Sequence, residues 1–306
     1  MGNNTALYIF MAERTPCYHR MKKLKQIIAQ VKTTDEASEE FNDLLWQLIC
    51  YSPKMPVRLQ QQQLLDEAEK FSLTAYDEHF THTHLNFNGF KWGSGKLKIV
   101  ITHGWGSKAA DFAELITALR QIPDTTIIAF DVPGNGSSEG ELSNGALFAE
   151  AAKAVMNQYG TPDILIGHSL GGMANVMALN DNGAKPKLLI SITPLIRLKE
   201  NFESSMNSAG VSAKMQAVYL KSFEELVGRA ASSYDVEKLY QRGLEQDHFL
   251  LYDEADMISP YKFIGDFLSA RLFIRNKNYP GAGHAGIIRS PEVIADIVAA
   301  ITAVLK

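Results

Sequence analysis

A serine flanked by glycines stands at the centre of residues 167–171, whose sequence is GHSLG. An apolar run precedes this segment, and an alanine-rich stretch with helical spacing follows it. The glycines leave room for a sharp strand-to-helix turn, which holds the serine Oγ exposed above a sheet. The pattern therefore predicts that Ser169 is a nucleophile of the kind that attacks the carbonyl carbon of an acyl group.

A base and an acid for this nucleophile follow in the second half of the chain. A serine hydroxyl needs a base within hydrogen-bond reach and a third group that orients the base. His284 lies in residues 281–286, GAGHAG, a loop unsuited to core packing, and we expect it to be the base. Asp253 and Asp256 both follow the apolar run 249–252, and either is placed to orient the histidine.

A loop with the sequence HGWG, residues 103–106, comes directly after the apolar run 97–101. Backbone N–H groups aimed at a developing oxyanion stabilise the transition state, by about 3–4 kcal/mol per donor where this has been measured. We expect the N–H groups of Trp105 and Leu170 to converge on the acyl oxygen and to form this oxyanion hole.

Taken together, these segments have the order nucleophile, acid, histidine, and the chain resembles the α/β-hydrolase-fold serine esterases over about residues 80–306. Residues 131–138, DVPGNGSS, are a further matching segment. The resemblance implies an α/β fold with a mostly parallel sheet flanked by helices, and hydrolysis of carboxylic esters without a cofactor. It favours Asp256 over Asp253 as the acid, although Tyr252-Asp253 stands where relatives often carry His-Gly or His-Asp.

The elements that must position these groups alternate between strand and helix. This rhythm is typical of a parallel sheet with right-handed crossovers, whose active loops lie at the carboxyl ends of the strands. We expect one catalytic domain over residues 73–306. The alternating segments are 97–102, 109–121, 126–131, 145–159, 163–168, 170–181 and 187–192, and a later strand is expected over 272–275.

Two regions break the rhythm. Residues 1–72 show helical spacing around 24–31 and 41–49 and a third helical pattern over 59–71, which predicts an N-terminal helical extension without assigned chemistry. The segment from Pro194 to about Gln246 is again helical, and we expect a small cap over the site; ordinary helix–sheet packing is the alternative. The residues expected to line an acyl pocket with Trp105 and Leu170 are Met173, Leu195, Phe202 and Met206.

We expect other histidine and aspartate side chains near the site to have structural roles. His103, His168 and Asp131 flank the catalytic loops, and we expect them to pack and hydrogen-bond those loops. The histidines at 79, 82 and 84 invite a metal interpretation, but no carboxylate or cysteine completes a ligand set, so we expect neither a metal nor a cofactor.

Composition narrows the class of protein. A chain of 306 residues with 46% hydrophobic content fits one large α/β domain, and a net charge of −4 gives no general attraction to nucleic acid. The N-terminus lacks the pattern of a signal peptide, and no run is apolar enough to span a bilayer. Cys17 and Cys50 lack metal or redox spacing, so we expect reduced thiols in a cytoplasmic protein, with a disulfide between them as the alternative. The sequence leaves the oligomeric state open.

Several reactions fit the same residues. The expected substrates are small-molecule esters with small to medium acyl chains. A thioesterase, a lactonase or an acyltransferase would use the same three side chains, and a ligand-binding or signalling protein would keep the fold with little turnover. A dehalogenase or an epoxide hydrolase is disfavoured, because relatives with those activities use an aspartate where this chain has Ser169.

Overall fold

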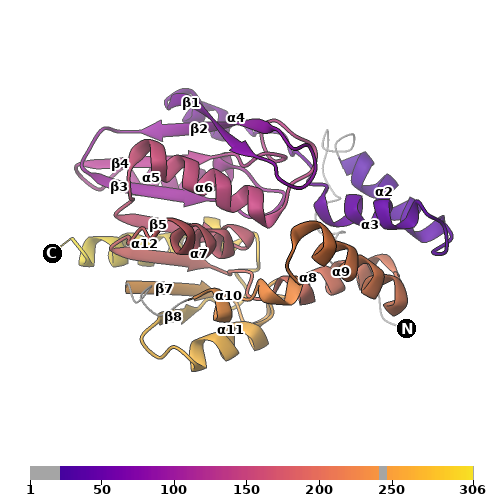
Figure 1. Cartoon of the computed structure of the whole chain (residues 1–306). Helices are drawn as coiled ribbons and strands as arrows, with labels where there is room; N and C mark the ends of the chain where they lie inside the picture. Colours follow the sequence, from indigo (N-terminus) through magenta and orange to yellow (C-terminus); the bar gives the residue numbers. More distant parts are fainter. Residues whose placement is uncertain (1–20, 241–246, 306) are drawn as a thin grey trace.

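Eight strands form one sheet in the computed structural model, which describes residues 21–240 and 247–305 (Figure 1). The strand order is β1-β2-β4-β3-β5-β6-β7-β8. β2 pairs antiparallel with β1 and β4, and every other neighbouring pair is parallel. The strands are β1 (Glu69–Tyr76), β2 (His84–Trp92), β3 (Leu97–Thr102), β4 (Thr125–Phe130), β5 (Ile164–His168), β6 (Leu188–Ile192), β7 (Asp247–Tyr252) and β8 (Arg275–Asn278).

From β3 onward, helices lie between consecutive strands, as the sequence predicts for an α/β fold. Side-chain caps fix several helix starts; for example, the Asn144 side chain accepts a hydrogen bond from the Leu147 N–H at the start of α6. The α-helices in the described residues are α2 (Met21–Thr33), α3 (Phe41–Cys50), α4 (Leu59–Asp66), α5 (Ala113–Leu119), α6 (Gly145–Tyr159), α7 (Leu170–Asn182), α8 (Leu198–Ala209), α9 (Ala213–Val227), α10 (Val236–Leu239), α11 (Tyr261–Ser269) and α12 (Pro291–Ala303).

The sheet separates two apolar layers. On β5, Leu165 packs in the layer that contains α6 and α7, whereas Ile164 and Ile166 pack in the layer that contains α5 and α12. Successive side chains of a strand point to opposite faces, so a parallel strand with helices on both sides is apolar throughout. The uninterrupted apolar run before Ser169 therefore reflects the burial of β5 on both faces.

The two helices before the sheet lie close to the helices that follow β6. α2 and α3 contact α8, and α3 also contacts α9. Figure 1 shows these four helices grouped beyond one end of the sheet, with α2 and α3 in indigo and α8 and α9 in orange-brown. Segments about 150 residues apart in the sequence are thus brought together over the same end of the strands.

Two predicted element boundaries are wrong. The helix predicted over 59–71 ends at Asp66, because Glu69–Tyr76 forms β1 and pairs with β2 along its length. The strand predicted over 272–275 begins only at Arg275. Residues 271–274 instead form a turn, closed by the hydrogen bond from the Ile274 N–H to the Arg271 carbonyl, and Leu272 is 90% exposed. β8 lies at the edge of the sheet. Its residues belong to the strand because they pair with β7, so the apolar content of the sequence does not mark where the strand begins.

Some sequence predictions concern residues outside the described ranges. These include the N-terminal start of the chain, Cys17, and the expected end of the cap at Gln246. Cys50 is buried with a free thiol. No helix within residues 21–240 and 247–305 combines the length and the apolarity needed to cross a membrane.

Candidate active site

Ser169 stands on the turn between β5 and α7. Its backbone has φ 53° and ψ −122°, a conformation that side-chain-bearing residues rarely adopt. The turn is tight because α7 begins directly against the loop after β3: a Cβ on Gly171 would lie 2.3 Å from the His103 carbonyl oxygen. A Cβ on Gly104 would lie 2.9 Å from the Cβ of Ser169. The glycines therefore let the two loops and the nucleophile approach one another.

The histidine loop brings His284 against one of the two candidate aspartates. The distance from His284 Nδ1 to Asp256 Oδ2 is 2.6 Å. Asp256 is buried, and its other oxygen accepts hydrogen bonds from the N–H groups of Ile258 and Ser259. Burial alone would raise the pKa of Asp256, but the hydrogen bond and charge of His284 and the two N–H donors together hold it below the ordinary value. The carboxylate is thus kept ionised beside the imidazole.

Asp253 has a different partner. Its Oδ2 accepts a hydrogen bond of 2.8 Å from the Gly283 N–H, and its Oδ1 accepts one of 3.0 Å from the Ala255 N–H. The side chain is buried at the end of β7. Asp253 therefore ties the backbone of the histidine loop to the acid turn, whereas Asp256 contacts the imidazole itself.

His168, next to the nucleophile, also supports the histidine loop. Its Nε2 lies 2.9 Å from the His284 carbonyl oxygen, and because a carbonyl only accepts, this nitrogen carries the proton. Burial, followed by the charge of His284, lowers the pKa of His168 to about 3. A neutral His168 therefore holds the backbone of His284 in place at ordinary pH.

The loop that contains Trp105 is fixed by buried side chains. His103 Nε2 accepts a hydrogen bond from the Val132 N–H, so its Nδ1 donates to the Gly104 carbonyl at 2.6 Å. Burial lowers the pKa of His103, which keeps this tautomer neutral. The Gly106 N–H donates to Asn135 Oδ1 at 3.2 Å. These bonds set the path of the backbone through Trp105.

Asp131 joins the same loops from the end of β4. Its Oδ1 accepts a hydrogen bond of 2.8 Å from the Ala109 N–H. Its Oδ2 accepts from both the N–H and the hydroxyl of Ser137, each at 2.8 Å. The position of Asp131 is that of a loop-forming residue, as its place at a strand end predicts.

A cavity of about 270 Å³ opens at Ser169. Ser169 and His284 both line it, together with Trp105 and Leu170. Three of the four residues expected at an acyl pocket also line this cavity, namely Met173, Leu195 and Phe202. Met206 is not among the residues that line it: its side chain is fully buried in the apolar layer, on the face of α8 that turns toward the core.

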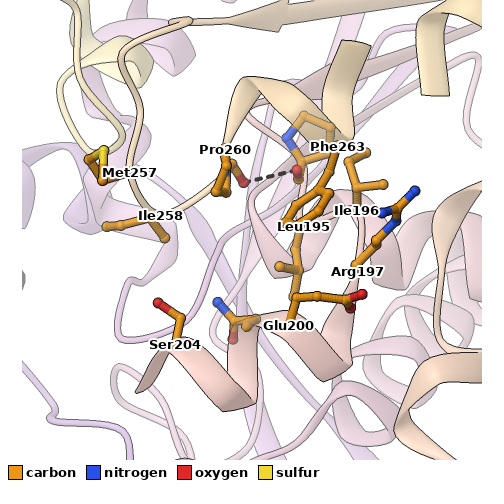
Figure 2. Close-up of a pocket in the computed structure, with 12 residues that line it drawn as sticks. Leu195, Ile196, Arg197, Glu200, Ser204, Met257, Ile258, Pro260 and Phe263 are labelled. Atoms are coloured by element: carbon orange, nitrogen blue, oxygen red, sulfur yellow. Dashed lines mark hydrogen bonds between the residues drawn. The ribbon is translucent and has the colours of Figure 1, made fainter. Parts of the chain in front are cut away.

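A second, smaller pocket of about 30 Å³ adjoins the first between α8 and the acid turn. Figure 2 shows Leu195, Glu200, Met257 and Phe263 around it. Leu195 lines both pockets. This pocket is much smaller than the first and is lined by neither Ser169 nor His284, so the larger cavity is the candidate substrate site.

Metal ligation finds no support in the described part of the chain. No group of three or more histidine, cysteine, aspartate or glutamate side chains there is placed to hold a metal ion. His79 lines the large cavity, whereas His82 and His84 are exposed on and beside the strand β2.

Comparison with known proteins identifies the family. Residues 99–297 match the alpha/beta hydrolase family, which is well over half of the chain. The chain belongs to the α/β hydrolase family.

Curated relatives of this hydrolase include esterases and lipases. The monoglyceride lipase of Rattus norvegicus is 29% identical over 149 residues, which cover 46% of this chain and 48% of the lipase. The match thus spans about half the length of that relative. The pimeloyl-(acyl-carrier protein) methyl ester esterase of Wigglesworthia glossinidia brevipalpis is 21% identical over 246 residues, which cover 67% of this chain and 93% of the esterase.

Solved structures share the fold of this hydrolase. An esterase from Pyrococcus furiosus has a TM-score of 0.59 at 16% identity and covers 84% of this chain and 97% of its own. The mouse alpha/beta hydrolase domain-containing protein 10 has a TM-score of 0.58 at 17% identity, with coverages of 78% and 98%. At these identities the likeness concerns the fold alone.

Sequence reasoning missed the contribution of the N-terminal helices to this site. Trp46 and Ile49 of α3 line the cavity that contains Ser169. The segment after α3 also reaches the Trp105 loop, because the Ser52 hydroxyl donates to Asn135 Oδ1 at 2.6 Å. The amphipathic pattern of α3 predicts a buried face but does not indicate which part of the molecule buries it.

Proposed function

We propose that this α/β hydrolase cleaves carboxylic esters through an acyl-enzyme, with Ser169 as the nucleophile, His284 as the base and Asp256 as the acid. One observation carries the proposal: His284 Nδ1 lies 2.6 Å from the buried Asp256 carboxylate, and the same imidazole lines the cavity of Ser169. The names of the monoglyceride lipase and the methyl ester esterase support ester substrates.

The reaction follows from the proton positions. The Ser169 hydroxyl gives its proton to His284 Nε2 as Oγ attacks the ester carbonyl carbon. Asp256 accepts a hydrogen bond from Nδ1 and stabilises the imidazolium, whose proton then passes to the leaving alkoxide as the ester C–O bond breaks. Water attacks the acyl-enzyme by the same route, which releases the carboxylic acid and restores the serine hydroxyl. No cofactor is needed in this cycle.

The oxyanion of each tetrahedral intermediate requires donors that are already in place. We assign this role to the backbone N–H groups of Trp105 and Leu170. Two features support the assignment: both residues line the nucleophile's cavity, and bonds from His103 and Asn135 fix the first of the two loops. Such a donor is worth about 3–4 kcal/mol in the transition state.

The acyl chain is proposed to occupy the apolar cavity, beneath a cap formed by residues 194–240, the described part of the expected cap. Leu195 and Phe202 come from this segment, and Met173 of α7 also lines the cavity. Apolar walls favour uncharged acyl chains of small to medium length over sugars or phosphates.

Covalent labelling combined with turnover tests this function. A fluorophosphonate is expected to label the wild-type protein at Ser169. Turnover is then measured on p-nitrophenyl esters and on acyl thioesters, and we expect multiple turnovers of the esters. Ser169→Ala is the labelling control. Labelling without turnover would favour a ligand-binding protein that retains the fold, and faster turnover of the thioester would favour a thioesterase.

A further inference from the structure

One wall of the Ser169 cavity comes from outside the region that matches the hydrolase family. Met21 and Leu24 of α2, and Trp46, Leu48 and Ile49 of α3, line the cavity. The family match begins only at residue 99. This wall is therefore a feature that the family match does not account for.

The lining of the cavity indicates what it accepts. None of the described residues that line it is a lysine, arginine, aspartate or glutamate. A charged group placed there would lose its hydration without gaining an ionic partner. The cavity has a volume of about 270 Å³, nearly twice that of an apolar cavity that holds benzene. The cavity thus fits an uncharged hydrocarbon chain of medium length.

The α3 wall is held at a fixed distance from the reaction centre. The Cys50 carbonyl at the end of α3 accepts a hydrogen bond of 2.9 Å from the Ser143 N–H. Two residues later, the Ser52 hydroxyl shares Asn135 Oδ1 with the Gly106 N–H of the oxyanion loop. The wall and the oxyanion loop are thereby joined through hydrogen bonds to a shared side chain, Asn135.

The same helix is joined to the cap helices on its other side. The Trp46 ring lies 4.9 Å from the Tyr219 ring and 6.1 Å from the Phe223 ring, measured between centroids. The Ser222 hydroxyl donates to Asn42 Oδ1 at 3.2 Å. α3 and α9 therefore form one continuous side of the cavity.

We propose that α2 and α3 form the wall that limits acyl-chain length, and that the substrates are esters of uncharged acyl chains of medium length. This inference rests on the proposed ester hydrolysis at Ser169. The N-terminal helices are then a specificity element, in which Leu48 and Ile49 contact the chain, while Ser52 sets the distance from the wall to the oxyanion loop.

Two leucines on the same helix provide a matched test. Leu48 lines the cavity, whereas Leu44, one turn earlier, is buried without lining it. Each variant to alanine is compared with wild type on p-nitrophenyl esters from acetate to palmitate. Leu48→Ala is expected to raise kcat/KM for longer esters relative to butyrate, by about fourfold for each methylene newly accommodated. Leu44→Ala is expected to leave the chain-length profile unchanged.

A substitution that makes the cavity smaller provides a second test in case Leu48→Ala fails to fold. Ile49→Phe adds volume to the wall and is expected to lower kcat/KM for the longest esters by a larger factor than for acetate. If the dependence of kcat/KM on chain length were the same in Leu48→Ala and Ile49→Phe as in Leu44→Ala, the inference would be overturned. The proposed ester hydrolysis would be unaffected by that result.

A binding measurement separates this inference from the proposed function. Trp46 and Trp105 both line the cavity, so their fluorescence reports the binding of n-alkanols of increasing length without turnover. A length limit that shifts in Leu48→Ala and Ile49→Phe supports the wall even if no ester is hydrolysed. A limit that is the same in all variants contradicts it.

Discussion

At the scale of single residues, three separate groups hold His284. Asp256 contacts its Nδ1, His168 donates to its carbonyl oxygen, and Asp253 accepts from the N–H of the preceding Gly283. The imidazole therefore has both its ring orientation and its backbone position fixed. A base that is already oriented loses little freedom when it accepts the proton.

Removal of the proposed nucleophile or of the proposed base gives the first prediction. Ser169→Ala and His284→Ala are each expected to lower kcat on p-nitrophenyl butyrate on the order of 10⁴-fold or more, because neither proton transfer nor acyl-enzyme formation remains. Ser208→Ala, on the exposed side of α8, is the surface control. Retained activity in a variant whose circular dichroism matches wild type would rule out the proposed mechanism.

The two aspartates give a second prediction. Asp256→Asn is expected to lower kcat by about 10⁴-fold with little change in KM, because an amide facing Nδ1 favours the wrong tautomer of His284. Asp253→Asn retains an oxygen that accepts from the Gly283 N–H, so we expect a loss within about tenfold. Steady-state kinetics of the two variants decides between them, and a larger loss in Asp253→Asn would move the acid to that position.

At the scale of elements, the rotation of α8 decides which of its side chains meet substrate. Phe202 lines the cavity and also packs edge-on against the Tyr219 ring, at 5.7 Å between centroids. Met206, one turn later, is buried in the apolar layer. The helix thus has one face that contacts the cavity and another that anchors it to the core.

This difference on α8 gives a third prediction. Phe202→Ala is expected to shift the preferred p-nitrophenyl ester toward longer chains. Met206→Ala is expected to leave that preference unchanged and to lower the free energy of unfolding by about 2–5 kcal/mol, as large-to-small core substitutions do. Chain-length profiles and urea titrations measure the two effects. A shifted profile in Met206→Ala would show that this side chain reaches the substrate.

At the scale of the whole molecule, buried histidines couple stability to pH. Burial lowers the pKa of His248 to about 3, and burial with the charge of His284 does the same for His168. Both values lie below the ordinary histidine pKa of about 6.5 in an unfolded chain. Between these values the unfolded chain binds a proton that the folded protein does not, so the folded state loses stability as the pH falls.

The fourth prediction follows from this loss of stability at low pH. The free energy of unfolding is expected to be insensitive to these histidines above pH of about 6.5, and to fall below it by about 1.4 kcal/mol per pH unit for each histidine. His248→Gln removes one titrating group away from the active site, although it also loses the ring stacked on Tyr240. Its stability is expected to fall less steeply than that of wild type in urea titrations from pH 7 to 4. Equal slopes would contradict the prediction.

The sequence alone determined the features that depend on local interactions. The glycines around Ser169 specify a tight turn because they remove side chains that would clash nearby, and the apolar run before it specifies a strand buried on both faces. The alternation of predicted strands and helices also indicates the α/β fold. It can be recognised in the sequence because the spacing of apolar residues is a property of each short segment. The sequence also shows the order in which the segments proposed for the nucleophile, the acid and the histidine follow one another.

Only the tertiary structure decided which distant groups meet. Asp253 and Asp256 both follow β7. In the folded protein the loop 281–286 brings the imidazole of His284 to Asp256 and the Gly283 N–H to Asp253. The rotation of α8 separated Phe202 from Met206, and the packing of α3 on α9 brought an N-terminal helix to the cavity. These outcomes depend on long-range packing, because a segment's own pattern shows that a face is buried but not what buries it.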